Sequence, residues 1–267
     1  MDFITSTHNE KIKRFIRLQK ARERREENLI VVEGQRELEL AIKAGLRVEQ
    51  LLYCPDFIAP DSRFEIIDRN NDDIISEYRG LAVLPGIFES LAFKQNPDGW
   101  LALVEPKPLT LSNIKLSSCP LVVVLEAVEK PGNLGAVLRT AYAAGADAVI
   151  VADPLTDIYN PNAIRASLGH VFTNQLAAAS FEETVAWLRT NGLQILSAAL
   201  PGSVAYTEPD MTKPTALVFG TEADGLGERW LKEADSVVRI PMRPGIDSLN
   251  LSVSAGIMLY EARRQRD

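Results

Sequence analysis

The second half of the chain alternates short apolar runs with helical segments, and this alternation constrains the fold more than any other feature. The run LVVVL at 121–125 is wholly apolar, as is typical of a strand buried on both faces of a parallel sheet. Helices predicted over 134–144 and 251–264 supply covering layers. The predicted strands are 121–125, 148–152, 194–200, 215–219 and 236–240. We therefore predict an α/β domain built on a parallel sheet.

The first 105 residues predict a smaller α/β domain of short, mixed elements. Its predicted helices cover 9–25, 36–44 and 72–78, and its predicted strands cover 29–33, 48–53, 64–67 and 100–104. A proline- and serine-rich segment follows, with the composition of a linker. We predict domains at 1–105 and 120–267, joined by a linker at 106–119.

Composition excludes several classes of protein. Two separated cysteines rule out a disulfide framework or a cysteine-based zinc site, and two scattered histidines rule out a histidine-rich metal centre, so we expect no metal. The chain has no stretch of about 20 apolar residues that could span a membrane, and charges near its N-terminus argue against a signal peptide. We expect a cytoplasmic protein that does not associate with membranes.

The segment His8–Arg25 is strongly basic in an otherwise acidic chain. It holds eight Lys and Arg residues against two Glu residues, whereas the whole chain has a net charge of −7. Such a surface can neutralise phosphates and gain affinity by counterion release. The alternative is a solvated charged face. The candidate RNA-binding residues here are Lys11, Arg14, Arg17 and Lys20.

Three loops of the second half follow predicted strands and gather glycines with polar side chains. The first carries Asn133 and Arg139 at the start of a helix, the second places Glu222 among glycines, and the third presents Ser248 and Asn250 before the last helix. Ligands of open α/β sheets bind beyond the carboxyl ends of the strands, where these loops fall. The alternative for each loop is a simple glycine turn or a helix cap. Neither a Walker A loop nor GxGxxG occurs.

Taken together and in this order, GNLGAVLRTA, LVFGTEADGLG and IPMRPGIDSLNLSVSAGIMLYE resemble the three signature motifs of the SpoU/TrmH family of the SPOUT superfamily, which are RNA 2′-O-ribose methyltransferases. The segment NPNAIRASLGHVF resembles the family's Arg-x-Ser-x-Gly segment. The first domain, through EGQRELELAIKAG and its element order, looks like the ribosomal-protein-like RNA-binding substrate domain of many members.

The resemblance implies S-adenosyl-L-methionine as cofactor, a deep trefoil knot in the C-terminal domain and a homodimer. The final helix (Val253, Ile257, Met258, Tyr260) contributes either to that dimer or to the monomer core. The implied donor-binding residues are Leu200, Gly220, Ile240 and Leu249. The implied catalytic and substrate-facing residues are Asn133, Arg139, Glu222, Ser248 and Asn250. Arg165 either touches RNA or pairs with an acidic neighbour, and His170 is expected to be a packed surface histidine.

The sequence thus predicts a 2′-O-ribose methyltransferase acting on structured RNA, with 23S rRNA as the expected substrate. A charged guanidinium has no acceptor, so we expect Arg139 to bind the adjacent phosphate and stabilise negative charge on the ribose oxygen, while the phosphate or a water takes the proton. The alternatives are a tRNA methyltransferase and a non-catalytic RNA-binding or ribosome-assembly factor. A nucleotide-dependent oxidoreductase is disfavoured by the missing GxGxxG.

Overall fold

The computed structural model describes residues 3–200, 203–221, 223–246 and 248–267. Contacts divide the chain into two units, one of Met1–Lys107 with Tyr159–Thr173 and one of Pro108–Ile158 with Asn174–Asp267. The segment Tyr159–Thr173 therefore makes its contacts with the N-terminal part of the chain, although in sequence it lies between two strands of the C-terminal sheet. The domain limits at 105 and 120 stay a prediction.

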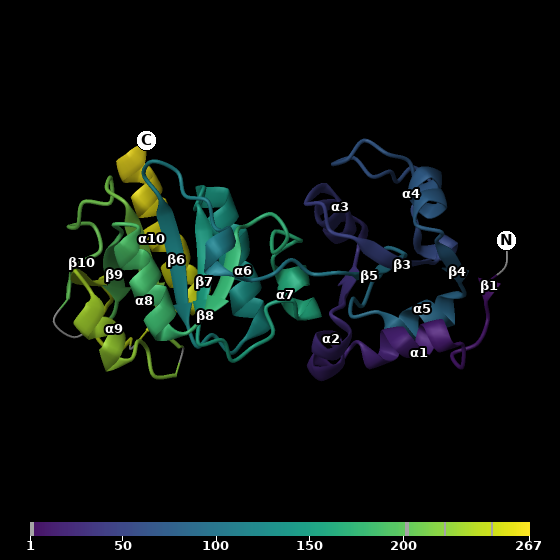
Figure 1. The fold of residues 1–267 in the computed structure, drawn as a ribbon, viewed down its shortest axis with the longest axis horizontal. Coiled ribbons are helices and arrows are strands. Elements are labelled where there is room, and N and C mark those ends of the chain that lie inside the picture. Colours follow the sequence, from purple (N-terminus) through teal and green to yellow (C-terminus); the bar gives the residue numbers. More distant parts are fainter. Residues whose placement is uncertain (1–2, 201–202, 222, 247) are drawn as a thin grey trace. The chain divides into compact units, whose positions relative to one another are not determined.

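A mixed five-stranded sheet forms the centre of the first unit (Figure 1). Its strands, in spatial order, are β1 (Phe3–Ile4), β4 (Leu81–Val83), β3 (Val48–Tyr53), β5 (Trp100–Val104) and β2 (Ile30–Glu33). Strand β5 runs antiparallel to β2 and β3, and the other pairs are parallel. The predicted strands that became β2, β3 and β5 are confirmed. The strand predicted over 64–67 is wrong, because Phe64 only forms an isolated bridge with Arg69.

Helices cover this sheet. They are α1 (Glu10–Arg17), α2 (Ala21–Glu27), α3 (Gln35–Lys43), α4 (Asn71–Glu77), α5 (Pro85–Leu91) and α7 (Pro161–Ala166), with a 3₁₀ turn η1 at Pro55–Phe57. Ile12 and Phe15 of α1 pack with Phe88 of α5 in one buried cluster. The single helix predicted over 9–25 is wrong, since two helices form. The buried guanidinium of Arg24 donates to the carbonyl of Gln19 at 2.7 Å, which satisfies a group beyond the end of α1.

A seven-stranded sheet forms the centre of the second unit, and every neighbouring pair in it is parallel. Its strands, in spatial order, are β10 (Val204–Ala205), β12 (Ser236–Arg239), β9 (Gln194–Ala198), β11 (Thr215–Phe219), β6 (Leu121–Glu126), β7 (Ala148–Ala152) and β8 (Leu176–Ala179). All residues of β6, β7 and β11 are buried. The parallel α/β prediction is therefore confirmed.

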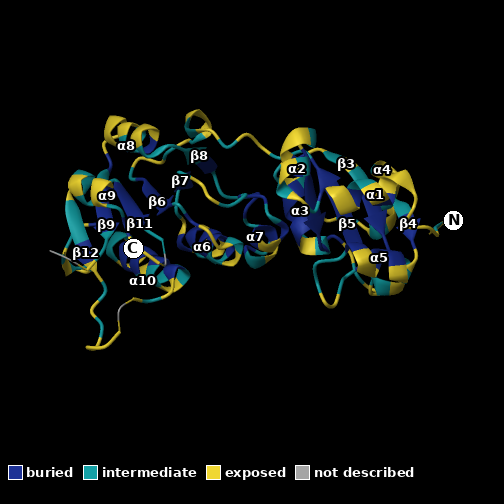
Figure 2. Cartoon of the chain, turned by 90° about the horizontal axis from the view of Figure 1, so that it is seen from below, coloured by how far each residue is buried: buried dark blue, intermediate teal, exposed yellow. Residues whose placement is uncertain are grey.

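Helices lie on both faces of this sheet (Figure 2). Helices α6 (Pro131–Ala144) and α10 (Leu251–Arg266) pack together on one face, and α8 (Phe181–Thr190) and α9 (Glu228–Glu233) lie on the other. A 3₁₀ turn η2 spans Leu111–Asn113. The apolar residues of α10 are divided, because Met258 is buried whereas Val253 and Tyr260 are about half exposed. None of the helices in the described ranges combines the length and apolar character that a membrane crossing needs.

Candidate active site

A cavity of about 410 Å³ opens beyond the carboxyl ends of β9, β11 and β12. The loops after these strands and the first two turns of α10 line it. Its lining includes all four predicted donor-binding residues, Leu200, Gly220, Ile240 and Leu249, and also Ser248. Parallel strands bring their carboxyl ends to one edge of the sheet, so residues that follow three separate strands converge there.

The loop after β11 is closed too tightly for a side chain at Gly220. A Cβ on Gly220 would lie 2.1 Å from the carbonyl carbon of Gly225. Thr221 and Gly225 hold the loop closed through two backbone hydrogen bonds of 3.0 and 3.1 Å. Gly225 itself has φ +70°, a conformation that favours glycine. The backbone of this loop therefore forms one wall of the cavity. The predicted catalytic residue Glu222 lies outside the described residues.

A buried carboxylate holds the exit of the same loop. Glu126, the last residue of β6, accepts the backbone N–H of Gly227 at 2.9 Å and the Nε and Nη2 of Arg229 at 3.1 and 2.9 Å. Arg229 also pairs with Asp153 at 2.5 Å and stacks over the ring of Phe181, 4.6 Å from its centroid. Burial alone would lower the pKa of Arg229, but the hydrogen bonds to Glu126 and Asp153 outweigh it and raise the pKa. The arginine therefore ties α9 to the ends of two strands.

Two predicted substrate-facing residues from distant motifs contact each other. Asn133 lies in the first turn of α6, and Asn250 is the N-cap of α10. The Nδ2 of Asn250 donates to the Oδ1 of Asn133 at 3.2 Å. The Oδ1 of Asn250 also accepts the backbone N–H of Ser252 at 2.9 Å, which caps the helix. Asn250 therefore caps α10 and also contacts Asn133. Ser248 and Leu249, which directly precede Asn250, line the cavity.

Arg139 lies on α6 and is exposed. Among the residues that the structure describes, none forms a hydrogen bond or an ion pair with its guanidinium. An arginine without an internal partner keeps all five of its N–H donors for a ligand. This arrangement suits an anion such as a phosphate.

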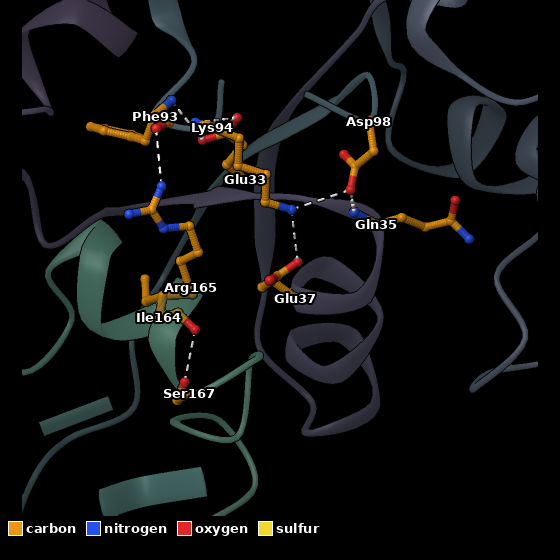
Figure 3. A network of polar contacts seen from close by, with 9 residues as sticks. All are labelled: Glu33, Gln35, Glu37, Phe93, Lys94, Asp98, Ile164, Arg165 and Ser167. Atoms are coloured by element: carbon orange, nitrogen blue, oxygen red, sulfur yellow. Dashed lines mark hydrogen bonds and ion pairs between the residues drawn. The ribbon is translucent and has the colours of Figure 1, made fainter. Parts of the chain in front are cut away.

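Arg165 does not pair with an acidic neighbour among the described residues. Its Nη1 donates to the carbonyl of Phe93 at 3.2 Å (Figure 3). Its Nη2 donates to the Oδ1 of Asn162 at 3.3 Å. The side chain remains exposed. His170 is partly buried, and its Nδ1 lies 3.0 Å from the Oγ1 of Thr173, in keeping with a packed surface histidine.

The basic face of the first two helices is partly neutralised by glutamates. Arg14 pairs with Glu27 and Glu49 at 2.6 and 2.5 Å, and Arg17 pairs with Glu27 at 3.0 Å. Lys11 and Lys20 are exposed and form no ion pair with any described residue. Of the four candidates on these helices, the two lysines therefore retain the least compensated charge.

Sequence reasoning missed the linkage of Glu126 with Arg229, since the two residues are 103 positions apart. One signal was present, because Glu126 is a carboxylate that directly follows a wholly apolar run. Within the described ranges, no group of three or more His, Cys, Asp or Glu side chains is placed to hold a metal ion.

Comparison with known proteins identifies both halves of the chain. Residues 120–260 match the model of the SpoU rRNA methylase family, and residues 9–102 match the MRM3-like substrate binding domain. A 23S rRNA (uridine(2479)-2′-O)-methyltransferase of Streptomyces viridochromogenes is 31% identical over 88% of this chain and 83% of its own length.

Two solved structures are similar over nearly the whole chain. A structure described as an RNA 2′-O ribose methyltransferase is 39% identical, with a TM-score of 0.83 and coverage of 99% of both chains. An AdoMet-bound rRNA methyltransferase from Sinorhizobium meliloti is 31% identical, with a TM-score of 0.85 and coverage of 98% of this chain and 97% of that chain. The chain described here belongs to the SpoU rRNA methylase family.

Proposed function

We propose that this protein transfers a methyl group from S-adenosyl-L-methionine to a ribose 2′-hydroxyl of 23S rRNA. One observation carries the proposal: a single cavity brings together all four residues expected to hold the donor, beside the Asn133–Asn250 pair expected to face the ribose. The AdoMet-bound relative supports the predicted cofactor, and the name of the Streptomyces relative favours rRNA over tRNA.

The cavity fits this cofactor. Its volume of about 410 Å³ lies within the range of cofactor sites. Leu200, Ile240 and Leu249 supply apolar side chains, whereas the closed loop from Gly220 supplies backbone donors and acceptors. When bound, S-adenosyl-L-methionine supplies an electrophilic methyl group.

The contribution of the protein is alignment and charge stabilisation. Arg139 binds the phosphate beside the target ribose and stabilises negative charge that develops on the 2′-oxygen. Asn133 and Asn250 orient the ribose hydroxyl, and Ser248 orients the loop that joins them to the cavity. The proton leaves to the RNA phosphate or to a water, since a charged guanidinium has no acceptor. Glu222 is retained as a further catalytic candidate from the motif alone.

The substrate-binding residues belong to the first unit. Of the five residues predicted to bind RNA, Lys11, Lys20 and Arg165 are exposed cations that no described acidic side chain neutralises, and they bind RNA phosphates. Arg14 and Arg17 bind RNA only when their ion pairs with glutamates break. The homodimer uses α10, whose exposed Val253 and Tyr260 provide an apolar surface. The working compartment is the cytoplasm.

Substitution of Arg139 tests the catalytic proposal. We expect Arg139→Ala to lower methylation of a 23S rRNA transcript by about a hundredfold or more, because it removes a group that acts on the transition state. Calorimetric titration should give an unchanged Kd for S-adenosyl-L-methionine. The matched control is Arg189→Ala, which removes an exposed arginine of α8 that pairs with Asp235 at 2.7 Å and should leave both quantities unchanged.

Three outcomes separate the alternatives. Full turnover by the Arg139 variant refutes its role. Methylation of bulk tRNA in preference to the rRNA transcript favours the tRNA enzyme. Donor and rRNA binding without turnover, in the isolated transcript and in ribosomal particles alike, favours a non-catalytic assembly factor.

A further inference from the structure

The segment Tyr159–Thr173 carries the Arg-x-Ser-x-Gly residues, and its contacts assign it to the first unit rather than to the methyltransferase sheet that flanks it in sequence. Helix α7 contacts strand β2 of the first unit. The side chain of Asn160 caps α7 by accepting the N–H of Asn162 at 2.9 Å. A piece of the methylase sequence is therefore built into the substrate-binding unit.

Ser167 and Gly169 have structural reasons to be present in this segment. Ser167 is fully buried; its hydroxyl donates to the carbonyl of Ile164 at 2.8 Å and accepts the N–H of Val171 at 3.2 Å. Gly169 has φ +79°, and a Cβ there would lie 2.9 Å from the Leu40 side chain and 3.1 Å from the Cα of Glu37. The serine shapes the turn, and the glycine lets the turn lie directly against the backbone of α3.

Arg165 is held by a relay that ends in a buried carboxylate (Figure 3). Its Nη1 donates to the carbonyl of Phe93 at 3.2 Å. Glu33, which is 6% exposed, accepts the backbone N–H of Phe93 at 2.7 Å and that of Lys94 at 3.2 Å. The Glu33 carboxylate on β2 thus fixes the turn at Phe93 and Lys94, and the carbonyl of Phe93 accepts the hydrogen bond from Arg165.

The side chain of Lys94 strengthens the same turn. Its Nζ lies 3.4 Å from the Oε2 of Glu37 and 3.3 Å from the Oδ2 of Asp98. The carboxylate of Asp98 also accepts the backbone N–H of Gln35 at 3.1 Å, at the start of α3. The turn and the helix that receives Gly169 are therefore joined by one polar network.

We propose that Glu33 is a positioning residue for RNA recognition: through the Phe93 turn it orients Arg165, so that the substrate-binding unit presents Arg165 to an RNA phosphate. The inference rests on the proposed function for the identity of the ligand. Two donors of the guanidinium are used within the protein, which leaves the others for a phosphate oxygen. RNA bound to the first unit then also contacts the Arg-x-Ser-x-Gly segment of the methylase sequence through Arg165.

Hydrogen exchange of the full chain tests the relay without RNA or donor. We expect Glu33→Ala to accelerate exchange in peptides covering 92–98 and 161–172, while exchange in α6 stays unchanged. Glu39→Ala is the matched control, because Glu39 is also a buried carboxylate of this unit that accepts a backbone N–H, from Ile66 at 3.1 Å, but it has no link to Arg165. It should affect only the region near Ile66. Unchanged exchange at 161–172 in the Glu33 variant overturns the relay.

The salt dependence of 23S rRNA transcript binding tests the recognition role. Arg165→Ala should lower the slope of log K against log salt by about one. Glu33→Ala should lower it equally, and the double variant should lower it no further. Glu33→Gln keeps an acceptor for the Phe93 N–H and should restore the original slope. A merely destabilising substitution leaves the slope unchanged, as Glu39→Ala should.

Two results overturn the proposal. One is an unchanged slope in Arg165→Ala, and the other is an unchanged slope in Glu33→Ala when Arg165→Ala lowers it. If Glu33→Ala does not fold, Glu33→Asp replaces it, since the shorter side chain withdraws the carboxylate from the Phe93 N–H. Failure of the proposed function is distinguishable. In that case the unsubstituted protein does not methylate 23S rRNA, whereas the hydrogen-exchange result is unaffected.

Discussion

The carboxylate of Glu126 offers the sharpest test of how the fold supports donor binding. It is 7% exposed and accepts one backbone N–H and two guanidinium N–H groups. Glu126→Gln keeps the shape but replaces one oxygen by an NH₂ group, so that a donor faces either Gly227 or Arg229. The change therefore removes a hydrogen bond at the exit of the loop that lines the cavity.

The structure sets the size of the effect. A hydrogen bond to a charged group contributes about 1.5–3 kcal/mol to stability. Arg229 is 42% exposed and retains Asp153, so that water and this second partner recover part of the loss. We expect the free energy of unfolding to fall by about 1–2 kcal/mol. For a domain of this size, that corresponds to a decrease in Tm of about 2–8 °C.

Donor affinity should fall together with stability, because the loosened residue ends the loop that forms a cavity wall. If about 1 kcal/mol of the lost stabilisation had held the loop in its donor-binding conformation, the Kd for S-adenosyl-L-methionine rises about fivefold. Calorimetric titration measures the Kd, and thermal denaturation measures the Tm. Both are made on the full chain without RNA.

Asp235→Asn is the matched control. Asp235 also accepts a backbone N–H, from Ile195 at 2.7 Å, and pairs with an arginine, Arg189, at 2.7 Å. It lies at the amino ends of β9 and β12, away from the cavity. The control should lower the Tm and leave the Kd unchanged. Equal donor affinity in the Glu126 variant and the unsubstituted protein, or an equal loss in the Asp235 variant, refutes the reasoning.

Three further predictions concern other parts of the chain. Gly220→Ala places a Cβ 2.1 Å from the backbone of Gly225, so calorimetry should find donor binding weakened by more than about tenfold; an unchanged Kd contradicts the closed loop. Burial raises the pKa of Glu33 above its ordinary 4.5 despite two backbone donors, so its contribution to stability is present below that value and is lost as pH rises through the raised pKa. In urea unfolding between about pH 5 and about pH 8, the stability of Glu33→Gln relative to the unsubstituted protein should therefore increase with pH, and a decrease contradicts the sign. Replacing Lys11 and Lys20 by Gln should lower the salt slope of rRNA binding by about two at unchanged Tm, whereas Arg14→Gln should chiefly lower the Tm, because Arg14 joins Glu27 and Glu49.

The parallel sheet was predictable because its central strands are buried on both faces and therefore read as continuous apolar runs. Strand β8 was not predicted, since its sequence LAAA lacks the β-branched and aromatic residues that favour strands. The helix predicted over 9–25 is interrupted for a reason outside local pattern. Arg24 turns back and binds the carbonyls of Leu18 and Gln19, a tertiary contact that periodicity does not contain.

The convergence of the donor residues was predictable for a similar reason. Leu200 and Ile240 end predicted strands and Gly220 directly follows one, and parallel strands end at one edge of the sheet. The groups that hold these loops were not predictable, because Glu126 and Arg229 are remote in sequence and neither carries a motif of its own.

The assignment of Arg165 marks the limit of reading motifs by their position along the chain. The segment around it follows β7 and precedes β8, so the order of elements alone places it with the methyltransferase sheet. Its contacts place it with the first unit, because Gly169 fits against α3 and Glu33 fixes the turn that receives the arginine. Under the proposal above, Ser167 and Gly169 of this motif serve packing within the first unit, and Arg165 serves RNA recognition. Substitutions of Ser167 or Gly169 should consequently change RNA binding through Arg165 and leave the donor cavity intact.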